Sequence, residues 1–255
     1  MCGRFAVTTD PALLAEKIKA INEVVAATSK DAGAPNYNVA PTTTVATVVT
    51  RHTEPDDEAT RRVRLMRWGL VPSWAKAGAD GAPEGKGPLL INARADKVAT
   101  SPVFRSSAKS KRCLVPMDGY YEWRVNPESA TGKKTAKTPF YMYRGDGEPL
   151  FAAGLWSVWK PAKDAAPLLS CTIITTDAVG ELAEIHDRMP LMLTETDWDA
   201  WLNPDAPLDP ELLSHPPDVR DIELRQISTL VNSVRNNGPE LLEPAERQPQ
   251  QMKLL

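Results

Sequence analysis

Short apolar runs of strand length dominate the pattern of hydrophobic and polar positions along this chain. The runs are rich in β-branched and aromatic residues, and turn residues such as Gly, Pro and Asp bound them, as is typical of strands. The pattern predicts strands at 43–50, 63–70, 113–117, 140–143, 151–156, 168–175 and 191–193. The charged stretch 52–61 is expected to form the tip of a hairpin between the first two.

Helical spacing of apolar residues occurs in only three stretches. The first, 10–25, opens with an Asp-Pro helix-start signal, and the second, 176–185, stops before Pro190. The third, 195–202, places Trp198 and Trp201 one turn apart. Many strands with few helices predict an α+β fold with a curved-sheet or barrel-like core and flanking helices.

Two segments carry little that could be buried. Residues 75–88 are rich in Gly, Ala and Pro and predict a flexible surface loop. The tail at 245–255 is mostly polar and is expected to be disordered.

Composition and charge narrow the classes of protein. The chain has 255 residues, 42% of them apolar, and no apolar run near the roughly 18 residues of a membrane helix. Its formal charge of −3 argues against a uniformly basic nucleic-acid binder. Residues 86–137 nevertheless carry eleven Lys or Arg against four Asp or Glu. This segment indicates either a local nucleic-acid contact or a solvated face.

The three cysteines are too few and too scattered for a disulfide framework or a zinc site, which favours a reducing cytoplasm. Cys113 and Cys171 lie in apolar runs and are expected to be buried strand residues. Cys2 is different, because removal of Met1 would give it both an α-amine and a thiol on neighbouring carbons. The N-terminus lacks a secretory signal pattern, so we expect Cys2 to become an accessible first residue.

Four polar clusters interrupt the apolar runs: CGR at 2–4, NAR at 92–94, YYEWR at 120–124 and HDRMP at 186–190. Loops beside strands commonly hold functional groups on a rigid scaffold. Each cluster alone also has an ordinary explanation. Asn92 could cap a turn, Glu122 could be a half-exposed strand residue, and His186 could end a helix.

Taken together, the clusters resemble a known family. The segments MCGRF, YNVAPT, WGLVPSW, INAR, DGYYEW, HDRMP and VNSVRNNGPELLEP occur in the order found in the SOS response-associated peptidase (SRAP) family, from Met1 to about Pro244. The resemblance implies one β-rich domain over 1–244 that covalently captures abasic sites in single-stranded DNA, a DNA-repair function. It implies no cofactor, no metal and no membrane partner, and a DNA-shielding protein of this kind can act as a monomer.

The chemistry of Cys2 makes this function reasonable. An abasic deoxyribose opens to an aldehyde, which a neutral amine can attack to form a Schiff base. An α-amine has a pKa of about 7.7 to 8.0, against about 10.4 for lysine, so its neutral fraction near pH 7 is much larger. The thiol of Cys2 can then close on the same carbon to form a durable thiazolidine ring.

The resemblance also assigns residues. It implies reactive roles for Cys2, Asn92, Glu122 and His186: Asn92 would hold the amine, Glu122 would move protons on the sugar oxygen, and His186 would assist. It implies DNA contacts for Arg4, Asn38, Pro41, Trp74, Arg94, Val103, Arg105, Thr175 and Arg188. Of these, Trp74, Pro41 and Val103 would form an apolar wedge. Val103 and Asp96 are shorter than the side chains that the family pattern predicts.

Two other functions use the same residues. Cys2 could be the nucleophile of a peptidase or amide hydrolase, with its α-amine as the base. Alternatively, the basic segment and the seven tryptophans could belong to a non-catalytic single-stranded DNA-binding module.

Overall fold

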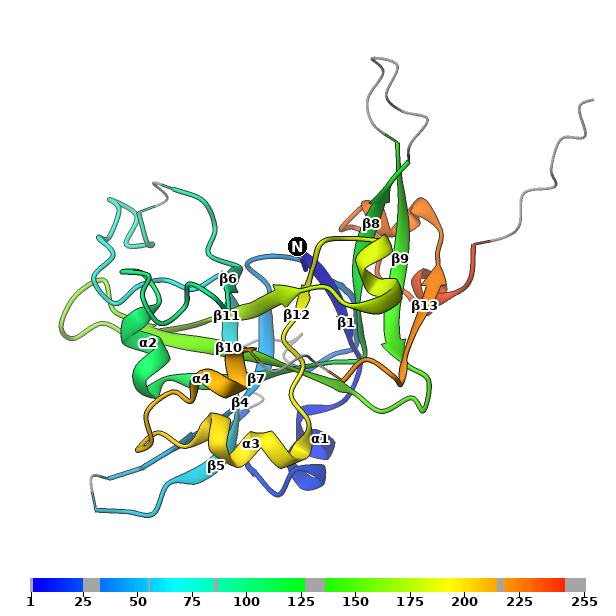
Figure 1. Ribbon diagram of the computed structural model, residues 1–255. Coiled ribbons are helices and arrows are strands. Elements are labelled where there is room, and N and C mark those ends of the chain that lie inside the picture. The colour runs from blue at the N-terminus through cyan, green and yellow to red at the C-terminus, as the bar shows by residue number, and fades with distance from the viewer. Residues whose placement is uncertain are drawn as a thin grey trace, which may run out of the picture.

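A five-strand barrel is the centre of the molecule (Figure 1). The computed structural model describes residues 2–24, 33–54, 56–84, 87–126, 136–214 and 218–245. The barrel strands are β4 (Thr44–Arg51), β5 (Thr60–Trp68), β7 (Arg112–Met117), β10 (Leu150–Trp159) and β11 (Leu168–Asp177). Neighbours pair in the order β5-β4-β7-β10-β11, and a parallel pairing of β11 with β5 closes the ring. The predicted α+β class with a curved, barrel-like core is confirmed.

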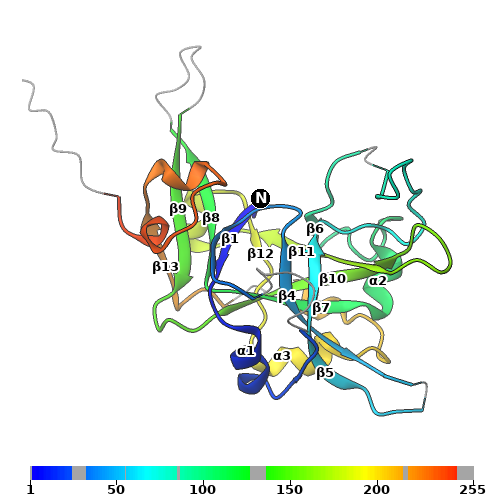
Figure 2. The same cartoon turned by 180° about the vertical axis from the view of Figure 1, so that it is seen from behind.

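Three short strands extend the barrel sheet, namely β2 (Ile21–Asn22), β6 (Asn92–Arg94) and β12 (Arg188–Pro190). A second sheet stands beside it, with the order β13-β9-β8-β1-β3 (Figure 2). Its strands are β1 (Arg4–Val7), β3 (Asn36–Val39), β8 (Gly119–Val125), β9 (Lys137–Arg144) and β13 (Ile222–Gln226). Cys2 comes just before β1, which has β8 and β3 as neighbours in the second sheet. The start of the chain therefore lies at the end of an interior strand of that sheet, close to the barrel.

Both faces of the barrel wall are buried, because alternate residues of each strand point to opposite sides. On β4, Val45 and Val49 pack into the cluster that faces the second sheet, whereas Ala46 and Val48 pack toward the helices. Cys113 and Cys171 are fully buried in strands, which confirms the expectation for these two thiols. Continuous burial explains why the strand runs are apolar rather than alternating.

The α-helices cover one side of the barrel; they are α1 (Pro11–Lys17), α2 (Arg105–Ser110), α3 (Glu195–Leu202) and α4 (Pro210–Ser214). There are also 3-10 turns in the described residues, η2 (Gly180–Glu184), η3 (Thr229–Asn232) and η4 (Pro239–Leu242), of which η3 and η4 contact the second sheet. The prediction of a helix at 195–202 is confirmed. Its start is fixed by a capping box, in which Thr194 and Asp197 satisfy each other's backbone N–H groups.

The helix expected at 10–25 is much shorter. Asp10 caps its start as predicted, but α1 ends at Lys17 and Lys19 adopts a left-handed conformation with φ of 53°. The chain then turns, and β2 pairs with β5 instead of continuing as a helix. Apolar spacing alone could not show this turn; Val25 lies outside the described residues.

The region 176–193 also differs from its prediction. Strand β11 continues to Asp177, and only a five-residue 3-10 turn follows where a helix was expected. The next strand is β12 at Arg188–Pro190, whereas 191–193 keeps only a single bridge between Met192 and Ala152. Within the polar HDRMP cluster, Arg188 pairs with Asp177 of β11.

The other boundaries agree with the sequence more closely. The charged stretch 52–59 joins β4 to β5 as the tip of a hairpin, with Pro55 outside the described residues. The described parts of 75–88 contain a single isolated bridge and neither helix nor strand. Residues 246–255, most of the tail expected to be disordered, lie outside the described part.

Candidate functional site

Cys2 lies at the entrance to β1, where the second sheet meets the barrel. The Asn92 side chain donates a hydrogen bond from Nδ2 to the Cys2 carbonyl oxygen at 2.8 Å. Asn92 begins β6, which pairs in parallel with β11, so the barrel itself positions this amide. The Oδ1 atom of Asn92 is buried and has no hydrogen-bond partner among the described residues. It remains available to accept a bond from a group at Cys2.

Glu122 reaches the same place from β8, which pairs with β1. The two strands are antiparallel and Arg4 lies opposite Tyr121. The next residue of β8, Glu122, therefore lies at the level of the residue before Arg4, close to Cys2. Glu122 is only 4% exposed. Burial raises the pKa of its carboxyl group, and His186 and the Trp123 backbone N–H act in the opposite direction. A carboxyl group with a raised pKa can serve as a proton donor near neutral pH.

His186 comes to this carboxyl group from the turn between η2 and β12. Its Nδ1 atom accepts the Arg188 backbone N–H at 3.0 Å and also lies 2.8 Å from Asp187 Oδ1. Nδ1 thus lies between a backbone donor and a carboxylate, and these two contacts fix the orientation of the ring.

The Cys2 side chain itself is fully buried, with 0% exposure in a chain that still carries Met1. This differs from the expectation of an accessible first residue. Burial raises the pKa of the Cys2 thiol well above its ordinary value, and the nearby Glu122 carboxylate adds to the effect. The thiol is therefore neutral at physiological pH, and any reaction at Cys2 must begin at another group or after the site opens.

Three of the residues expected to bind DNA lie together at the edge of the barrel sheet. The pairing of β6 with β11 sets Arg94 opposite Thr175, and β12 brings Arg188 opposite Asp177. Arg188 donates to the Thr175 carbonyl oxygen and pairs with Asp177, while Thr175 is fully buried. Arg94 is exposed and forms a two-bond pair with Asp96 at 2.9 and 3.0 Å. The shorter carboxylate at 96 thus reaches Arg94 after all.

Arg4 and Asn38 lie on the other side of Cys2. Asn38 is 4% exposed, and its side chain bonds to Arg4 and to carbonyl groups of residues 231–236. Arg4 stacks over the Trp123 ring, 5.5 Å from its centroid. Trp123 is a residue that sequence reasoning did not assign, although it directly follows Glu122 in the YYEWR cluster.

The apolar wedge expected from three residues is brought together in part. Trp74 is 67% exposed, and with Val103 it lines a cavity of about 720 Å³ whose walls are mainly apolar. Pro41 lies in the β3–β4 turn, next to a hydrogen bond from Thr42 N to Trp68 O, and does not line this cavity.

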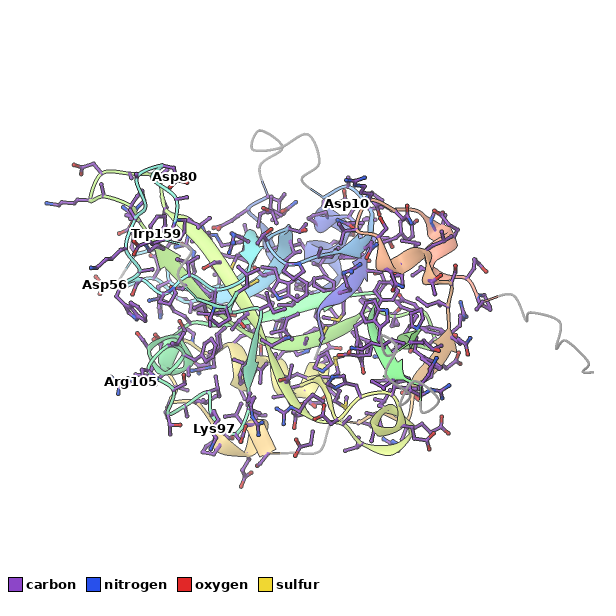
Figure 3. The ribbon with its side chains drawn as sticks, turned by 90° about the horizontal axis from the view of Figure 1, so that it is seen from above. Asp10, Asp56, Asp80, Lys97, Arg105 and Trp159 are labelled. Atoms are coloured by element: carbon purple, nitrogen blue, oxygen red, sulfur yellow. The ribbon has the colours of Figure 1, made fainter. Side chains whose placement is uncertain are left out.

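The basic segment at 86–137 divides into two kinds of residue. Lys97 and Arg105, the first residue of α2, both lie at an outer edge of the molecule (Figure 3), and Arg105 is exposed. Arg112, in contrast, is 2% exposed and bonds only to backbone carbonyl groups in the described structure. Lys86, Lys133 and Lys134 lie outside the described residues. Only part of the positive charge counted in this segment is therefore exposed where DNA could contact it.

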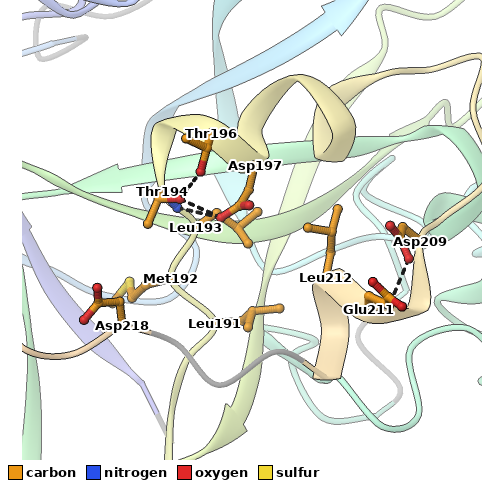
Figure 4. A pocket seen from close by; sticks show the side chains of 10 residues that line it. All are labelled: Leu191, Met192, Leu193, Thr194, Thr196, Asp197, Asp209, Glu211, Leu212 and Asp218. Carbon is orange, nitrogen blue, oxygen red and sulfur yellow. Dashed lines mark hydrogen bonds between the residues drawn. The ribbon is translucent and has the colours of Figure 1, made fainter.

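A second hollow, of about 390 Å³, lies on the side of α3 and α4 (Figure 4). Its lining includes the acidic residues Asp197, Asp209, Glu211 and Asp218 and no Lys or Arg. DNA phosphates would be repelled there. No group of three or more His, Cys, Asp or Glu suited to a metal ion occurs in the described residues. Within the same ranges, no helix is long and apolar enough to cross a membrane.

Comparison with known proteins gives consistent results. The family model described as SOS response associated peptidase (SRAP) matches residues 1–234. The chain is 36% identical over 247 residues to abasic site processing protein YoqW of Bacillus subtilis, covering 95% of this chain and 99% of that one. It is 32% identical over 234 residues to abasic site processing protein HMCES of Gallus gallus, covering 83% and 67%. A crystal structure of a Bacteroides thetaiotaomicron protein superposes with a TM-score of 0.75 at 25% identity, covering 96% and 100%.

Proposed function

Because the chain belongs to the SOS response associated peptidase family, we propose that it captures abasic sites in single-stranded DNA covalently through Cys2. The observation that carries the proposal is the convergence of three dispersed clusters on Cys2. Asn92 bonds to the Cys2 carbonyl group, Glu122 lies close enough to raise the pKa of the Cys2 thiol, and His186 lies close enough to act on the pKa of Glu122. The names of relatives such as YoqW and HMCES, both abasic site processing proteins, support the choice of target.

The reaction begins after Met1 is removed, when the α-amine of Cys2 attacks the aldehyde carbon of the opened sugar. A C–N bond forms, the carbonyl oxygen leaves as water, and the product is an imine. The Cys2 thiol then adds to the same carbon; a C–S bond forms and the thiol proton passes to the ring nitrogen. The raised pKa of the thiol supports this order, because the amine is then the stronger nucleophile at the start.

The surrounding residues move protons and hold the amine. Glu122, whose pKa is raised, gives a proton to the ring oxygen of the sugar as the ring C–O bond breaks, while the anomeric hydroxyl loses its proton to water and becomes the aldehyde; closure of the ring reverses these transfers. The unpartnered Oδ1 of Asn92 accepts an N–H of the α-amine and directs its lone pair toward the aldehyde. His186, which Arg188 and Asp187 hold in position, assists by bonding a sugar hydroxyl group or relaying a proton.

Contacts with the DNA backbone come from the arginines around this site. Arg94 and Arg188 bind phosphates on the β6–β12 edge, where Asp96 and Asp177 hold their side chains in position. Arg105 extends the positive surface beside α2. Phosphate contacts carry no sequence information, as binding to a lesion in any sequence requires. The buried Asn38 and Thr175 support neighbouring arginines in this account.

Trp74→Ala should weaken binding of single-stranded DNA by about 1 to 3 kcal/mol, because an exposed indole is a stacking platform for a base. Its exposure means that stability should change by less than about 0.5 kcal/mol. Fluorescence anisotropy with an abasic oligonucleotide measures the first effect, and thermal unfolding measures the second. Leu13→Ala, which removes a side chain 63% exposed on α1, is the control and should leave binding unchanged. Equal binding by the Trp74 variant and the wild type would remove Trp74 from the proposed DNA path.

Glu122→Gln should slow capture and stabilise the fold at neutral pH. The folded state raises the pKa of Glu122, so this group's stabilising contribution is complete below the unfolded pKa of about 4.5 and is lost as pH rises through the folded pKa. Glutamine cannot ionise and avoids that loss. Urea unfolding at pH 4 should show similar stability for both proteins, and at pH 7.5 the variant should be the more stable. A variant less stable than the wild type at pH 7.5 would contradict a raised pKa.

A denaturing gel tests the proposed function itself. The protein, an abasic single strand and an intact strand of the same sequence are mixed, and an adduct that survives denaturation is expected with the abasic strand alone. A peptidase or amide hydrolase would instead turn over peptide substrates without forming this adduct. A simple DNA-binding module would bind both strands and form no adduct with either.

A further inference from the structure

The rim segment, residues 230–235, borders the site on the side away from Trp74. It includes part of η3, which packs beside β9. In Figures 1 and 2 the start of the chain lies between this orange segment, next to β8 and β9, and the loop that precedes β6. The loop before β6 includes Leu89 and follows Trp74. Cys2 is therefore flanked by two separate surface elements.

Two residues near Cys2 hold the rim segment in place. Arg4 donates from Nη1 to the Val231 carbonyl oxygen at 2.7 Å and from Nη2 to that of Asn232 at 3.3 Å. Asn38 donates from Nδ2 to the carbonyl oxygens of Val231, Ser233 and Asn236, at 3.3, 3.0 and 3.0 Å. The rim segment is thus fixed to β1, which follows Cys2, and to its neighbour β3, and much of Arg4's bonding capacity is used in fixing it.

The rim segment is also joined to Trp123. The indole Nε1 of Trp123 donates to Asn232 Oδ1 at 2.7 Å, and Arg4 covers the ring. Trp123, which follows Glu122 on β8, is therefore in direct contact with the rim segment. A strand of DNA that leaves Cys2 over the end of β8 would meet these residues next.

The outer side of the rim segment combines apolar and positive groups. Leu230 is 50% exposed and Val234 is 56% exposed, and Arg235 is also exposed. Residues 227–239 contain no Asp or Glu, although the whole chain carries a net negative charge. Exposed apolar side chains beside an arginine, without acidic neighbours in the sequence, suit nucleic acid, whose bases offer flat aromatic faces and whose phosphates are anionic.

We propose that the rim segment is a second contact surface for the same single strand, on the opposite side of the lesion from Trp74. Leu230 and Val234 pack against sugars and bases, and Arg235 binds a phosphate. This inference rests on the proposed capture of abasic single-stranded DNA. It adds a direction: Trp74 contacts the strand on one side of the lesion, and the rim segment contacts it on the other.

Arg235→Gln tests the surface, with Arg220→Gln as the matched control. Arg220 is an exposed arginine paired with Asp218 on the chain before β13, away from Cys2. Both substitutions are made with Cys2→Ala, so that binding is measured without an adduct. Arg235→Gln should weaken binding about threefold to tenfold and reduce the slope of log affinity against log salt by about one. Arg220→Gln should change neither.

Shortened oligonucleotides then test the direction. One oligonucleotide lacks the nucleotides on the 5′ side of the abasic site, and another lacks those on the 3′ side. The effect of Arg235→Gln should vanish with one of them and persist with the other, and the effect of Trp74→Ala should show the reverse pattern. Loss of both effects with the same oligonucleotide would overturn the proposal.

A paired substitution examines the apolar part. Leu230→Ser with Val234→Ser should weaken binding with the same side dependence as Arg235→Gln, while thermal unfolding shows that the protein remains folded. If neither the double variant nor Arg235→Gln changed DNA binding, the rim segment would not be a contact surface. Wild-type protein in the same samples keeps the two proposals distinct: if it forms no adduct with the abasic strand, the proposed function itself fails.

Discussion

Replacing Cys2 by serine should reduce the denaturation-resistant adduct with abasic DNA to the background seen with intact DNA. The variant keeps an α-amine, so an imine can still form, but no sulfur is present to close the thiazolidine ring. The open imine is hydrolysed on denaturation. The amount of shifted DNA on a denaturing gel measures this effect, which we expect to be the largest of any substitution at the site.

Cys171→Ala is the matched control, because Cys171 is a buried thiol in β11 whose pKa burial raises to about 12. It should form the adduct at the wild-type level when assayed well below its unfolding temperature. Binding of undamaged single strands by Cys2→Ser should also remain, because phosphate contacts supply it. Adduct formation by Cys2→Ser equal to that of the wild type would contradict the proposed chemistry.

Arg112→Met should destabilise the protein by at least about 3 kcal/mol, the largest stability effect that we expect from a single substitution. The buried guanidinium donates to five carbonyl groups, from Ala108, Lys109, Trp201, Asn203 and Ala206. It therefore joins the end of α2 to the end of α3. Methionine fills similar space but leaves these acceptors without a donor, and each buried unsatisfied group costs about 1 to 3 kcal/mol.

Urea unfolding measures the difference, and Arg105→Met is the control. Arg105 begins α2, close to Arg112, but its side chain is exposed. Its substitution should change stability by less than about 0.5 kcal/mol. A similar, small effect of both substitutions would mean that water or a shifted backbone satisfies the carbonyl groups around Arg112.

The barrel strands could be predicted because their apolar runs have strand length and clear turn signals. Closure of the barrel could not, since the parallel pairing of Ser170 and Cys171 with Arg67 and Trp68 joins residues about a hundred positions apart. Short strands such as β1 and β6 could not be predicted, because β1 has only four residues and β6 is the polar sequence NAR. The helix at 10–25 was overestimated because local spacing contains no sign of the left-handed residue at 19.

The sequence indicates which residues to look for around Cys2, but not how they pack. Spacing in the sequence gives no indication that Asn38 is buried and holds the rim segment, or that Arg4 is used in the same way. The burial of Cys2 was also unforeseen, because the residues that cover it come from both sheets. Trp123 and Arg235 lie in motifs that carried the resemblance, yet only their contacts and exposure suggest roles for them.

Intact mass spectrometry of the protein mixed with an abasic oligonucleotide shows both which residue begins the chain and whether the lesion is captured. Capture through Cys2 predicts a protein mass without Met1, and an adduct whose mass is the sum of this protein and the oligonucleotide less one water. The same protein with an uncleavable extension before Cys2 should give no adduct. An adduct that retains Met1, or one formed equally by the extended protein, would contradict capture by the 1,2-aminothiol of Cys2.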